Sequence, residues 1–458
     1  MKKSIVWLVL CLTTTVVQAQ SEKPNILIII TDQQNAKMMG VAGNEWLKTP
    51  NMDKLANKGL RFEKAYVTNP VCSPSRFSLF TGQYPSAIDM RHNASKLDIA
   101  ALQKIIPNAM GNAFAKAGYE TFYGGKSHLP GAKKEVKPYG FETFISKDER
   151  DQLAAESVEL LTNRTSDKPF LLALNFINPH DICYEAIRQF PPNNRPPADV
   201  PVPLLEAIAI PDSIDEDDFM AKYVPPLPAN FEPTSDEPRA IYDLKELHSF
   251  TIDAREHWTE KDWRMHRYAY HRLTESVDVQ IGMVLDALEA SPFADNTIVI
   301  FTSDHGEMSG SHRLEHKTVF YEESANVPLV VWYKGMANGQ SVDKENMIST
   351  GLDLYPTLCD LAGISSLGHL PGLSFAPLLK DQKSDYYSRR YLFMENELGF
   401  MIRGDNIKYT LYDNGDEMLI DLEQDPGELV NLSQNVAYKE RKAKLKALLQ
   451  KHIEEANQ

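Results

Sequence analysis

The sequence predicts an α/β fold with a large, mainly parallel sheet flanked by helices, followed by a smaller C-terminal α+β domain. Two observations carry this prediction. Continuous apolar runs rich in β-branched residues, typical of strands buried on both faces, alternate with amphipathic helical patterns over most of the chain. Beyond about residue 384, shorter strand patterns separated by turn residues replace this alternation and lead into a last helical pattern.

Each element can be placed in order along the chain. Strands are expected at 23–34, 119–126, 168–180 and 296–307, and helices at 49–62, 106–119, 150–164 and 272–292. Residues 184–238 are rich in proline and acidic side chains, so we expect an irregular insertion there. Antiparallel strands are expected at 390–396, 399–412 and 417–426, with turns at 404–405 and 414–415, before a helix at 437–456. We therefore expect one domain at 20–383 and a C-terminal α+β domain at 384–458.

Residues 1–19 have the features of a signal peptide. Two lysines stand near the start, a short apolar segment comes next, and small residues precede an expected cleavage after Ala19. The apolar segment is too short to span a membrane, and Leu10 stands before Cys11 where a lipoprotein signal would have a small residue. The sequence therefore favours a periplasmic or secreted protein without a membrane span over a surface lipoprotein.

The charge and the cysteines narrow the class of protein. The formal net charge of −15 argues against a general nucleic-acid-binding protein, so an anionic ligand would need a local basic cluster. Of four cysteines, three lie beyond the signal peptide: Cys72, Cys183 and Cys359. An odd number cannot pair fully within one chain, and their spacing fits no zinc site. Cys359 has the helical spacing of a small buried residue, whereas Cys72, in the polar stretch NPVCSPSRFSLFTG, remains a candidate reactive group.

Ionisable and amide side chains follow the expected strands where the strands end. They are Asp32 and Gln33 after the first strand, Lys126 and His128 after the second, His180 after the third, and Asp304 and His305 after the fourth, with Lys317 further along. A single polar residue at a strand end is commonly a turn former. Because the carboxyl ends of parallel strands meet at one edge, where ligands bind in open α/β sheets, the whole set predicts a functional site.

Part of this set is suited to a metal ion. Asp32, Gln33, Asp304 and His305 offer mainly oxygen ligands. Oxygen ligands suit a hard divalent cation, with calcium first, whereas a zinc site would have more imidazole or thiolate.

The rest of the set is suited to an anion and to proton transfer. Arg76, Lys126 and Lys317 supply positive charge that, together with a metal, would hold a tetrahedral oxyanion. His128 and His180 can transfer protons near neutral pH. The predicted reaction is hydrolysis of a sulfate or phosphate ester.

The motifs resemble those of a known family. CSPSR followed by SLFTGQYPS resembles the signature of the type I sulfatases, Cys-x-Pro-x-Arg with Leu-Thr-Gly behind it. The blocks PNILIIITDQQ, LKTPNMDKLANKGLRFEKAY, GGKSHL, NPHD, SDHGEMSGSH and FYEESANVPLVVW are similar to sulfatase blocks and stand in the same order. The resemblance covers almost the whole mature chain and implies an alkaline-phosphatase-like fold and a sulfuric ester hydrolase.

The resemblance also implies a modified cysteine and a metal. In this family a maturase oxidises the motif cysteine to formylglycine, and the hydrated aldehyde supplies the attacking hydroxyl. The resemblance implies that Cys72 is this residue, and Cys72 is expected to begin a short helix through RFSLFTG, whose N-terminal amides would favour negative charge. It implies that calcium is held by Asp32, Gln33, Asp304, His305 and modified Cys72. Many members have Asp in place of Gln33 and Asn in place of His305, so this metal site has one formal charge fewer than an Asp-Asp start.

Roles for the remaining residues follow from the same resemblance. Arg76 would orient the formylglycine hydrate, Lys126 would contact the nucleophile and the sulfate, and Lys317 would hold a sulfate oxygen. His128 would take a proton from the second hydroxyl, and His180 would protonate the leaving alcohol.

The substrate is predicted less sharply. Gln33 together with NPHDICYE is similar to carbohydrate sulfatases of glycan-degrading bacteria, which implies a sulfated glycan or glycosaminoglycan fragment. The alternatives are a phosphate or phosphonate monoester hydrolase of the same superfamily, a sulfatase of the arylsulfatase or choline-sulfatase type, and a non-catalytic glycan-binding protein. His312 either contacts a sugar hydroxyl or is a solvated loop residue. Cys183 either lines the pocket or is a small buried residue.

Overall fold

A computed structural model of the chain describes residues 23–132, 135–147, 150–189, 200–246, 248–336, 341–380, 389–404 and 406–456. The predicted signal peptide and part of the predicted insertion, 190–199, lie outside the described residues. Within the described ranges, no helix is both long and apolar enough to cross a membrane.

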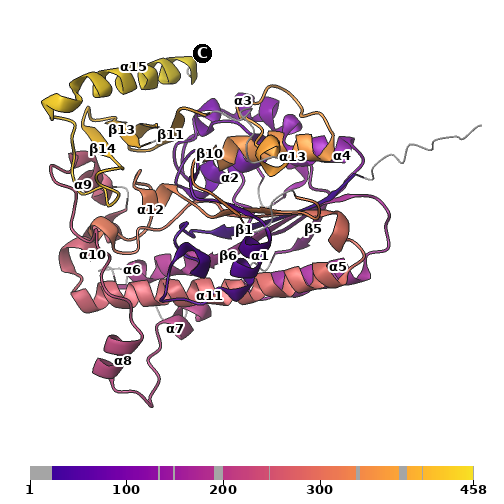
Figure 1. Cartoon of the computed structure of the whole chain (residues 1–458), viewed down its shortest axis with the longest axis horizontal. Helices are drawn as coiled ribbons and strands as arrows, with labels where there is room; N and C mark the ends of the chain where they lie inside the picture. Colours follow the sequence, from indigo (N-terminus) through magenta and orange to yellow (C-terminus); the bar gives the residue numbers. More distant parts are fainter. Residues whose placement is uncertain are drawn as a thin grey trace, which may run out of the picture.

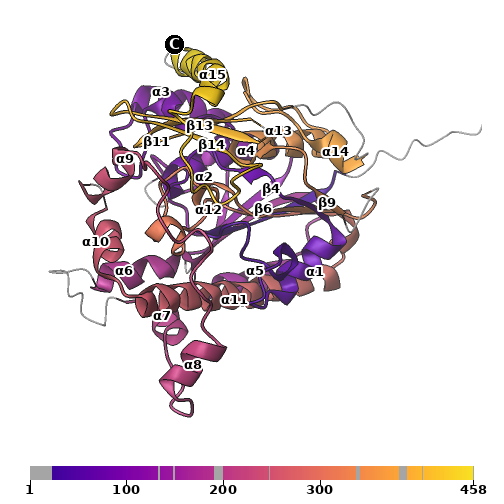
Figure 2. The same ribbon diagram turned by 60° about the vertical axis from the view of Figure 1, so that its left-hand side comes forward.

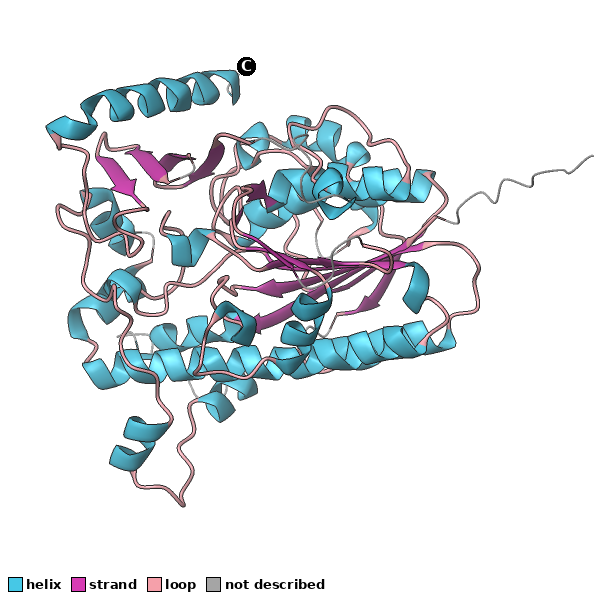
Figure 3. Cartoon of the chain, in the orientation of Figure 1, coloured by secondary structure: helices cyan, strands magenta, loops and turns pink. Residues whose placement is uncertain are grey.

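An eight-stranded sheet lies at the centre of the molecule (Figure 1; Figure 3). Across the sheet the strands are β5 (Thr143–Ser146), β4 (Glu120–Gly125), β6 (Phe170–Pro179), β1 (Asn25–Asp32), β7 (Thr297–Ser303), β8 (Leu329–Trp332), β2 (Leu60–Phe62) and β9 (Ser341–Asp343). Neighbouring strands are parallel except that β8 is antiparallel to both β7 and β2. The predicted mainly parallel sheet is confirmed, and so are its four predicted strands, which are β1, β4, β6 and β7.

Helices cover both faces of this sheet because its central strands are apolar on both faces. Leu27 and Ile29 of β1 face one layer, and Ile26 and Ile28 face the other. The first layer contains α1 (Pro50–Lys58), α5 (Leu153–Asn163) and α11 (Glu260–Ala290). The second contains α2 (Cys72–Thr81), α4 (Met110–Lys116), α13 (Thr350–Ala362) and α14 (Ala376–Lys380). Figure 2 shows the sheet between α11 on one side and α13 and α4 on the other.

Several helix boundaries differ from the prediction, and two of them have a clear physical reason. The helix expected at 49–62 ends at Lys58, and the last residues form β2 instead. Gly59 stands between the helix and the strand. Only glycine fits there, because a Cβ would lie 2.5 Å from the carbonyl oxygen of Val331 in β8. The helix expected at 272–292 begins earlier, at Glu260, because Thr259 and Asp262 form a capping box.

The prediction of a wholly irregular insertion at 184–238 is wrong for the described part. It contains α6 (Cys183–Gln189), α7 (Val202–Ala207) and α8 (Glu216–Lys222). Proline lies in the first turn of α7, and Asp215 caps α8 by accepting hydrogen bonds from the backbone of Asp217 and Asp218. Proline and acidic residues are favourable at helix starts, so this composition reflects short helices as well as loops.

The C-terminal region forms a separate antiparallel sheet covered by a helix, as predicted. Its strands are β11 (Leu392–Asn396), β12 (Gly399–Arg403), β13 (Ile407–Tyr412) and β14 (Glu417–Asp421), and the helix is α15 (Lys439–Ala456). Leu445 and Leu449 of α15 pack on Tyr409 and Ile402 of the sheet. The domain boundary at residue 384 stays a prediction.

Short elements complete the fold. They are β3 (Ala65–Tyr66), which pairs with β10 (Ile348–Ser349), and the helices α3 (Ile99–Ile105), α9 (Arg239–Tyr242), α10 (Ser249–His257) and α12 (Glu322–Ala325).

Candidate active site

The parallel strands bring the predicted site residues to one edge of the sheet. β1 and β7 pair up to their last residues, so Asp32 and Asp304 lie side by side. Lys126 and His180 follow β4 and β6, which continue the sheet on the other side of β1. α2 begins at Cys72, as its sequence predicted, and its N-terminus meets the same edge.

Arg76 holds the two aspartates in place. Its buried guanidinium donates through Nε to Asp304 Oδ2 at 2.8 Å and through Nη2 to Asp32 Oδ2 at 3.0 Å. Its Nη1 donates to the side chain of Asn175 and the backbone oxygen of Lys126, both at 2.9 Å. Lys126 Nζ also lies 2.6 Å from Asp32 Oδ2. Burial alone would raise the pKa of Asp32, but Lys126, His180 and Arg76 together hold it well below its usual range.

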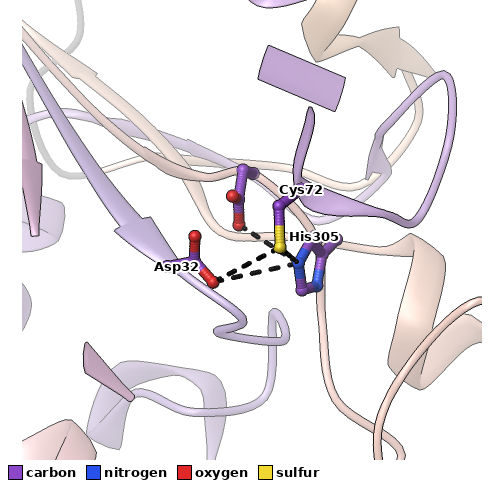
Figure 4. A group of neighbouring side chains, drawn as sticks. Asp32, Cys72 and His305 are labelled. Carbon is purple, nitrogen blue, oxygen red and sulfur yellow. Dashed lines mark hydrogen bonds and ion pairs between the residues drawn. The ribbon is translucent and has the colours of Figure 1, made fainter. Parts of the chain in front are cut away.

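The second oxygen of each aspartate faces a gap shared with Cys72 and His305 (Figure 4). Asp32 Oδ1 lies 3.8 Å from Cys72 Sγ and 3.9 Å from His305 Nε2. Asp304 Oδ1 lies 3.6 Å from His305 Nε2, which is 3.1 Å from Cys72 Sγ. Such separations suit ligands gathered around one cation at about 2.3–2.6 Å.

Charge also makes this gap suitable for a cation. Burial and the nearby Asp32 raise the pKa of Asp304 to about 6, because two buried carboxylates repel each other. A bound divalent cation would relieve that repulsion. His305 Nδ1 lies 2.9 Å from the Gly306 carbonyl oxygen, which leaves Nε2 directed at the gap. The donor set therefore fits a hard cation such as calcium.

Gln33 lies beside this gap and is held by partners on both ends of its amide. Its Oε1 accepts from Lys317 Nζ at 2.7 Å and from Cys183 Sγ at 3.0 Å, while its Nε2 donates to Glu307 Oε2 at 2.5 Å. Since a lysine can only donate, the amide oxygen must face Lys317. Glu307 also accepts from the backbone N–H of His316 at 2.6 Å, so it is fixed itself. The sequence analysis missed Glu307, although it stands in the SDHGE stretch behind β7.

The Cys72 sulfur is buried among positive charges. Lys317 Nζ lies at 3.3 Å and Lys126 Nζ at 3.7 Å from Sγ. Burial alone would raise the pKa of the Cys72 thiol, but Lys126, Lys317 and His305 hold it well below its usual value. In contrast, burial raises the pKa of Cys183 well above its usual value. Cys183 is buried and contacts Gln33, and its place in the lining of the pocket stays a prediction.

The two histidines expected to transfer protons have different environments. His180 Nε2 lies 4.0 Å from Asp32 Oδ1, and its Nδ1 is buried without a hydrogen-bond partner. Burial and Lys126 lower the pKa of His180 to about 4. His128 is exposed, has a positive φ of 42° and adds to the lowering of the Cys72 pKa. Burial and the charge of Lys126 therefore favour the neutral form of His180.

His312 is not a solvated loop residue, so that interpretation is wrong. Its buried ring stacks on Tyr321 at 3.8 Å between centroids, and its nitrogens lie 3.3 Å from Thr234 Oγ1 and 3.4 Å from Asn230 Nδ2. The loop folds this way because His312 takes a left-handed conformation, with φ of 56°. The ring is thus committed to protein partners rather than placed beside Cys72, and we do not carry it into the substrate-binding set.

The structure thus gathers the predicted constellation around Cys72. The residues brought together are Asp32, Gln33, Arg76, Lys126, His128, His180, Asp304, His305 and Lys317. Besides Glu307, the sequence analysis missed Arg150, which binds Asp181 in bidentate fashion at 2.7 and 3.0 Å and so anchors the residue next to His180.

Comparison with known proteins identifies the family. The family model described as Sulfatase matches residues 24–364. The chain belongs to the sulfatase family. It is therefore a sulfuric ester hydrolase, and the predicted family is confirmed. A second model, N-sulphoglucosamine sulphohydrolase, C-terminal, matches residues 310–455.

Known sulfatases resemble this one over nearly its full length. A Delta 4,5-hexuronate-2-O-sulfatase of Bacteroides thetaiotaomicron is 32% identical over 97% of this chain and 91% of its own length. An arylsulfatase of Clostridium perfringens is 27% identical over 94% of this chain and 95% of its own. A solved structure of a 2-O GAG sulfatase has a TM-score of 0.78 and 29% identity, covering 95% of this chain and 93% of that one.

Proposed function

We propose that this sulfatase removes sulfate from a sulfated saccharide, a glycan or glycosaminoglycan fragment, with Cys72 matured to formylglycine and a calcium ion in the gap. The observation that carries the proposal is the position of Cys72 Sγ. It lies at the start of α2, 3.1 Å from His305 Nε2 and 3.3 Å from Lys317 Nζ, beside two aspartates held by Arg76. The saccharide part is supported by the printed activities of the hexuronate sulfatase and the GAG sulfatase.

When present, calcium would polarise the sulfate, and formylglycine would supply the attacking hydroxyl. Asp32, Gln33, Asp304, His305 and modified Cys72 are the proposed calcium ligands, with Gln33 contributing its amide oxygen. The oxygen of Gln33 already faces the lysine that contacts Cys72, which supports its place in this set.

Charged residues of the chain would bind the sulfate. Lys126 and Lys317 reach Cys72 Sγ from different segments, at 3.7 and 3.3 Å, so both can contact a sulfate placed on that residue. Arg76 neutralises the two aspartates and orients the residue at position 72 through them. His128, which is exposed and adds to the lowering of the Cys72 pKa, is the proposed base for the second hydroxyl.

His180 is the proposed acid for the leaving alcohol. Its pKa of about 4 in the unliganded protein results from burial and from the charge of Lys126. A sulfate bound between the two lysines offsets that charge, so the pKa of His180 rises when the substrate binds. Proton uptake by His180 would thus accompany substrate binding.

Two measurements test this function. The first is peptide mass spectrometry of the Cys72 fragment together with metal analysis, where we expect formylglycine and one calcium ion per chain. An active preparation with only the thiol, or with stoichiometric zinc and no calcium, contradicts the mechanism. The second is turnover of a panel of sulfated mono- and disaccharides, with an aryl sulfate and the matching aryl phosphate for comparison. Faster turnover of the phosphate favours the phosphate or phosphonate hydrolase instead, and Cys72→Ala is the inactive control.

The predicted export of the protein is part of the proposal. We propose that a maturase modifies Cys72 and that the signal peptide is removed after Ala19 on export to the periplasm or medium. N-terminal sequencing of the exported protein checks this, and a mature start at Met1 contradicts it.

A further inference from the structure

A polar cluster at the rim of the site has no part in the chemistry above. Glu397, in the turn between β11 and β12, meets two histidines from distant segments of the chain. Its Oε1 lies 3.1 Å from His248 Nε2, and its Oε2 lies 3.7 Å from His92 Nδ1. The C-terminal sheet thus presents a carboxylate to two segments of the larger domain.

Contacts on two sides connect this cluster to Cys72. On one side, Ser73, which follows Cys72, donates through its backbone N–H to Asn93 Oδ1 at 3.0 Å, and Asn93 is the neighbour of His92. On the other side, the His316 ring lies 5.6 Å from the His248 ring, and the next residue, Lys317, contacts Cys72.

The cluster is pre-arranged and open to a ligand. The side chain of Glu397 is only 7% exposed, whereas those of His92 and His248 are 37% and 29% exposed. His92 Nδ1 accepts from the backbone N–H of Ala94 at 3.1 Å, so its 3.7 Å approach to Glu397 is not a hydrogen bond and Nε2 is the donor of the ring. Phe250 packs edge-on against His316 at 5.1 Å and is itself half-buried. A carboxylate, an imidazole donor and an aromatic ring therefore lie in segments that adjoin Cys72.

From this arrangement we infer that Glu397, His92 and His248 form a subsite for the hydroxyl groups of the sugar unit at the sulfate ester. A carboxylate and an imidazole can form hydrogen bonds with hydroxyl groups, and an aromatic face can pack against the C–H face of a sugar ring. The carboxylate of Glu397 disfavours a second sulfate or a uronate carboxylate at the same point, because like charges repel in a half-buried setting. The subsite therefore selects a neutral, hydroxylated face. This inference rests on the proposed saccharide sulfatase function.

The experiment compares two substrates in matched variants. Glu397→Ala, Glu397→Gln and His248→Ala are assayed on the best sulfated sugar of the panel and on 4-nitrophenyl sulfate, which has no hydroxyls. Glu440→Ala, on the exposed side of α15, is the control. We expect kcat/KM on the sugar to fall roughly 10- to 100-fold in the Glu397 variants, since hydrogen bonds to a charged group are strong, while the aryl sulfate changes by less than about twofold.

Three outcomes overturn the subsite. They are equal losses on both substrates, no loss on the sugar, and a wild-type protein that hydrolyses the aryl sulfate but no sugar of the panel. A wild-type protein inactive on all sulfates, after formylglycine is confirmed, instead overturns the proposed function. A deoxy analogue of the sugar substrate sharpens the test: Glu397→Ala should no longer reduce its turnover if the missing hydroxyl is the one that Glu397 binds.

Discussion

Among the described residues, two buried clusters of charge differ in how their side chains are arranged. One is the Cys72 site. The other, here named the Lys408 cluster, consists of Glu322, Arg403, Lys408 and Glu428 between the larger domain and the C-terminal sheet. Lys408 Nζ lies 2.6 Å from Glu428, 3.0 Å from Glu322 and 2.8 Å from the Phe320 carbonyl oxygen. Burial raises the pKa of Glu428 to about 7, whereas Arg403 and Lys408 overcome burial and hold the pKa of Glu322 well below its usual range.

The two clusters differ in the partners of their carboxylate oxygens. In the Lys408 cluster the single lysine binds both acids directly, and Lys408 and Glu428 are each 1% exposed. In the Cys72 site each aspartate binds Arg76 through one oxygen and directs the other at a shared gap. That gap also reaches solvent, since Lys126 is 11% and His180 is 20% exposed. The two clusters therefore differ in geometry: the Cys72 site gathers ligand atoms of four residues within 4.8 Å of one another, whereas a lysine bridges two acids in the Lys408 cluster.

The largest effect is expected from Asp304→Asn in the Cys72 site. It removes one ligand charge but keeps the shape and one acceptor for Arg76, so kcat/KM on an aryl sulfate should fall by about 1,000-fold and bound calcium should be lost. Thermal unfolding should change little, because the cluster is not what holds the sheet together. Wild-type activity with wild-type calcium content would contradict the assignment.

Lys408→Met should show the opposite behaviour. It leaves Glu322 and Glu428 without their shared lysine, so the free energy of unfolding should fall by about 3 kcal/mol, as measured by urea denaturation. At a temperature where the variant is folded, kcat/KM should match that of the wild type. A loss of activity without a loss of stability would mean that the Lys408 cluster has a functional role.

His180→Ala tests the proposed acid within the active cluster. An alkyl sugar alcohol needs a proton as it leaves, whereas nitrophenolate needs little help. We expect kcat/KM to fall by about 100-fold on a sulfated sugar and far less on 4-nitrophenyl sulfate. Equal losses would assign His180 to sulfate binding and make Lys317 the next candidate for the acid.

Exchanging the acid and the amide between positions 307 and 33 tests how Glu307 orients Gln33. In Glu307→Gln the amide of Gln33 loses the acceptor that fixes its orientation, so calcium affinity, measured by calorimetry, should fall by about 10-fold. Adding Gln33→Glu reverses donor and acceptor and restores the hydrogen bond, so the double variant should bind calcium more tightly than the single one. If it does not, Glu307 acts only through local packing.

The smallest effect concerns pH and Glu395, a buried carboxylate outside both clusters. Burial raises the pKa of Glu395 to about 7, although Ser86 donates a backbone hydrogen bond to it at 2.5 Å. The folded state therefore binds this proton more tightly than the unfolded state, and stability is gained as pH falls through 7. Between pH 8 and pH 6 the free energy of unfolding should rise by about 1 kcal/mol from this group. The same titration of Glu395→Gln should lack this increment, and an unchanged pH profile would show that Glu395 is not responsible.

Much of the site could be predicted because it depends on local sequence and on one topological rule. Asp32 and Asp304 each follow an unmistakable buried strand, and parallel strands end at a common edge. The remaining contacts depend on pairs of loops. Glu307 meets Gln33 across 274 residues of sequence, and His248 meets Glu397 across 149. No pattern within either segment indicates such a partner.

The sequence by itself determined the alternation of strands and helices, the start of α2 at Cys72 and the set of groups delivered to the sheet edge, because periodicity and strand ends are local properties. Only the tertiary structure decided which partner each side-chain atom of these residues contacts. Arg76 takes one oxygen from each aspartate, Glu307 turns the amide of Gln33, and Tyr321 covers His312 and removes it from the site. The physical reason is that hydrogen-bond commitment depends on distances between segments far apart in the chain, and folding alone sets those distances.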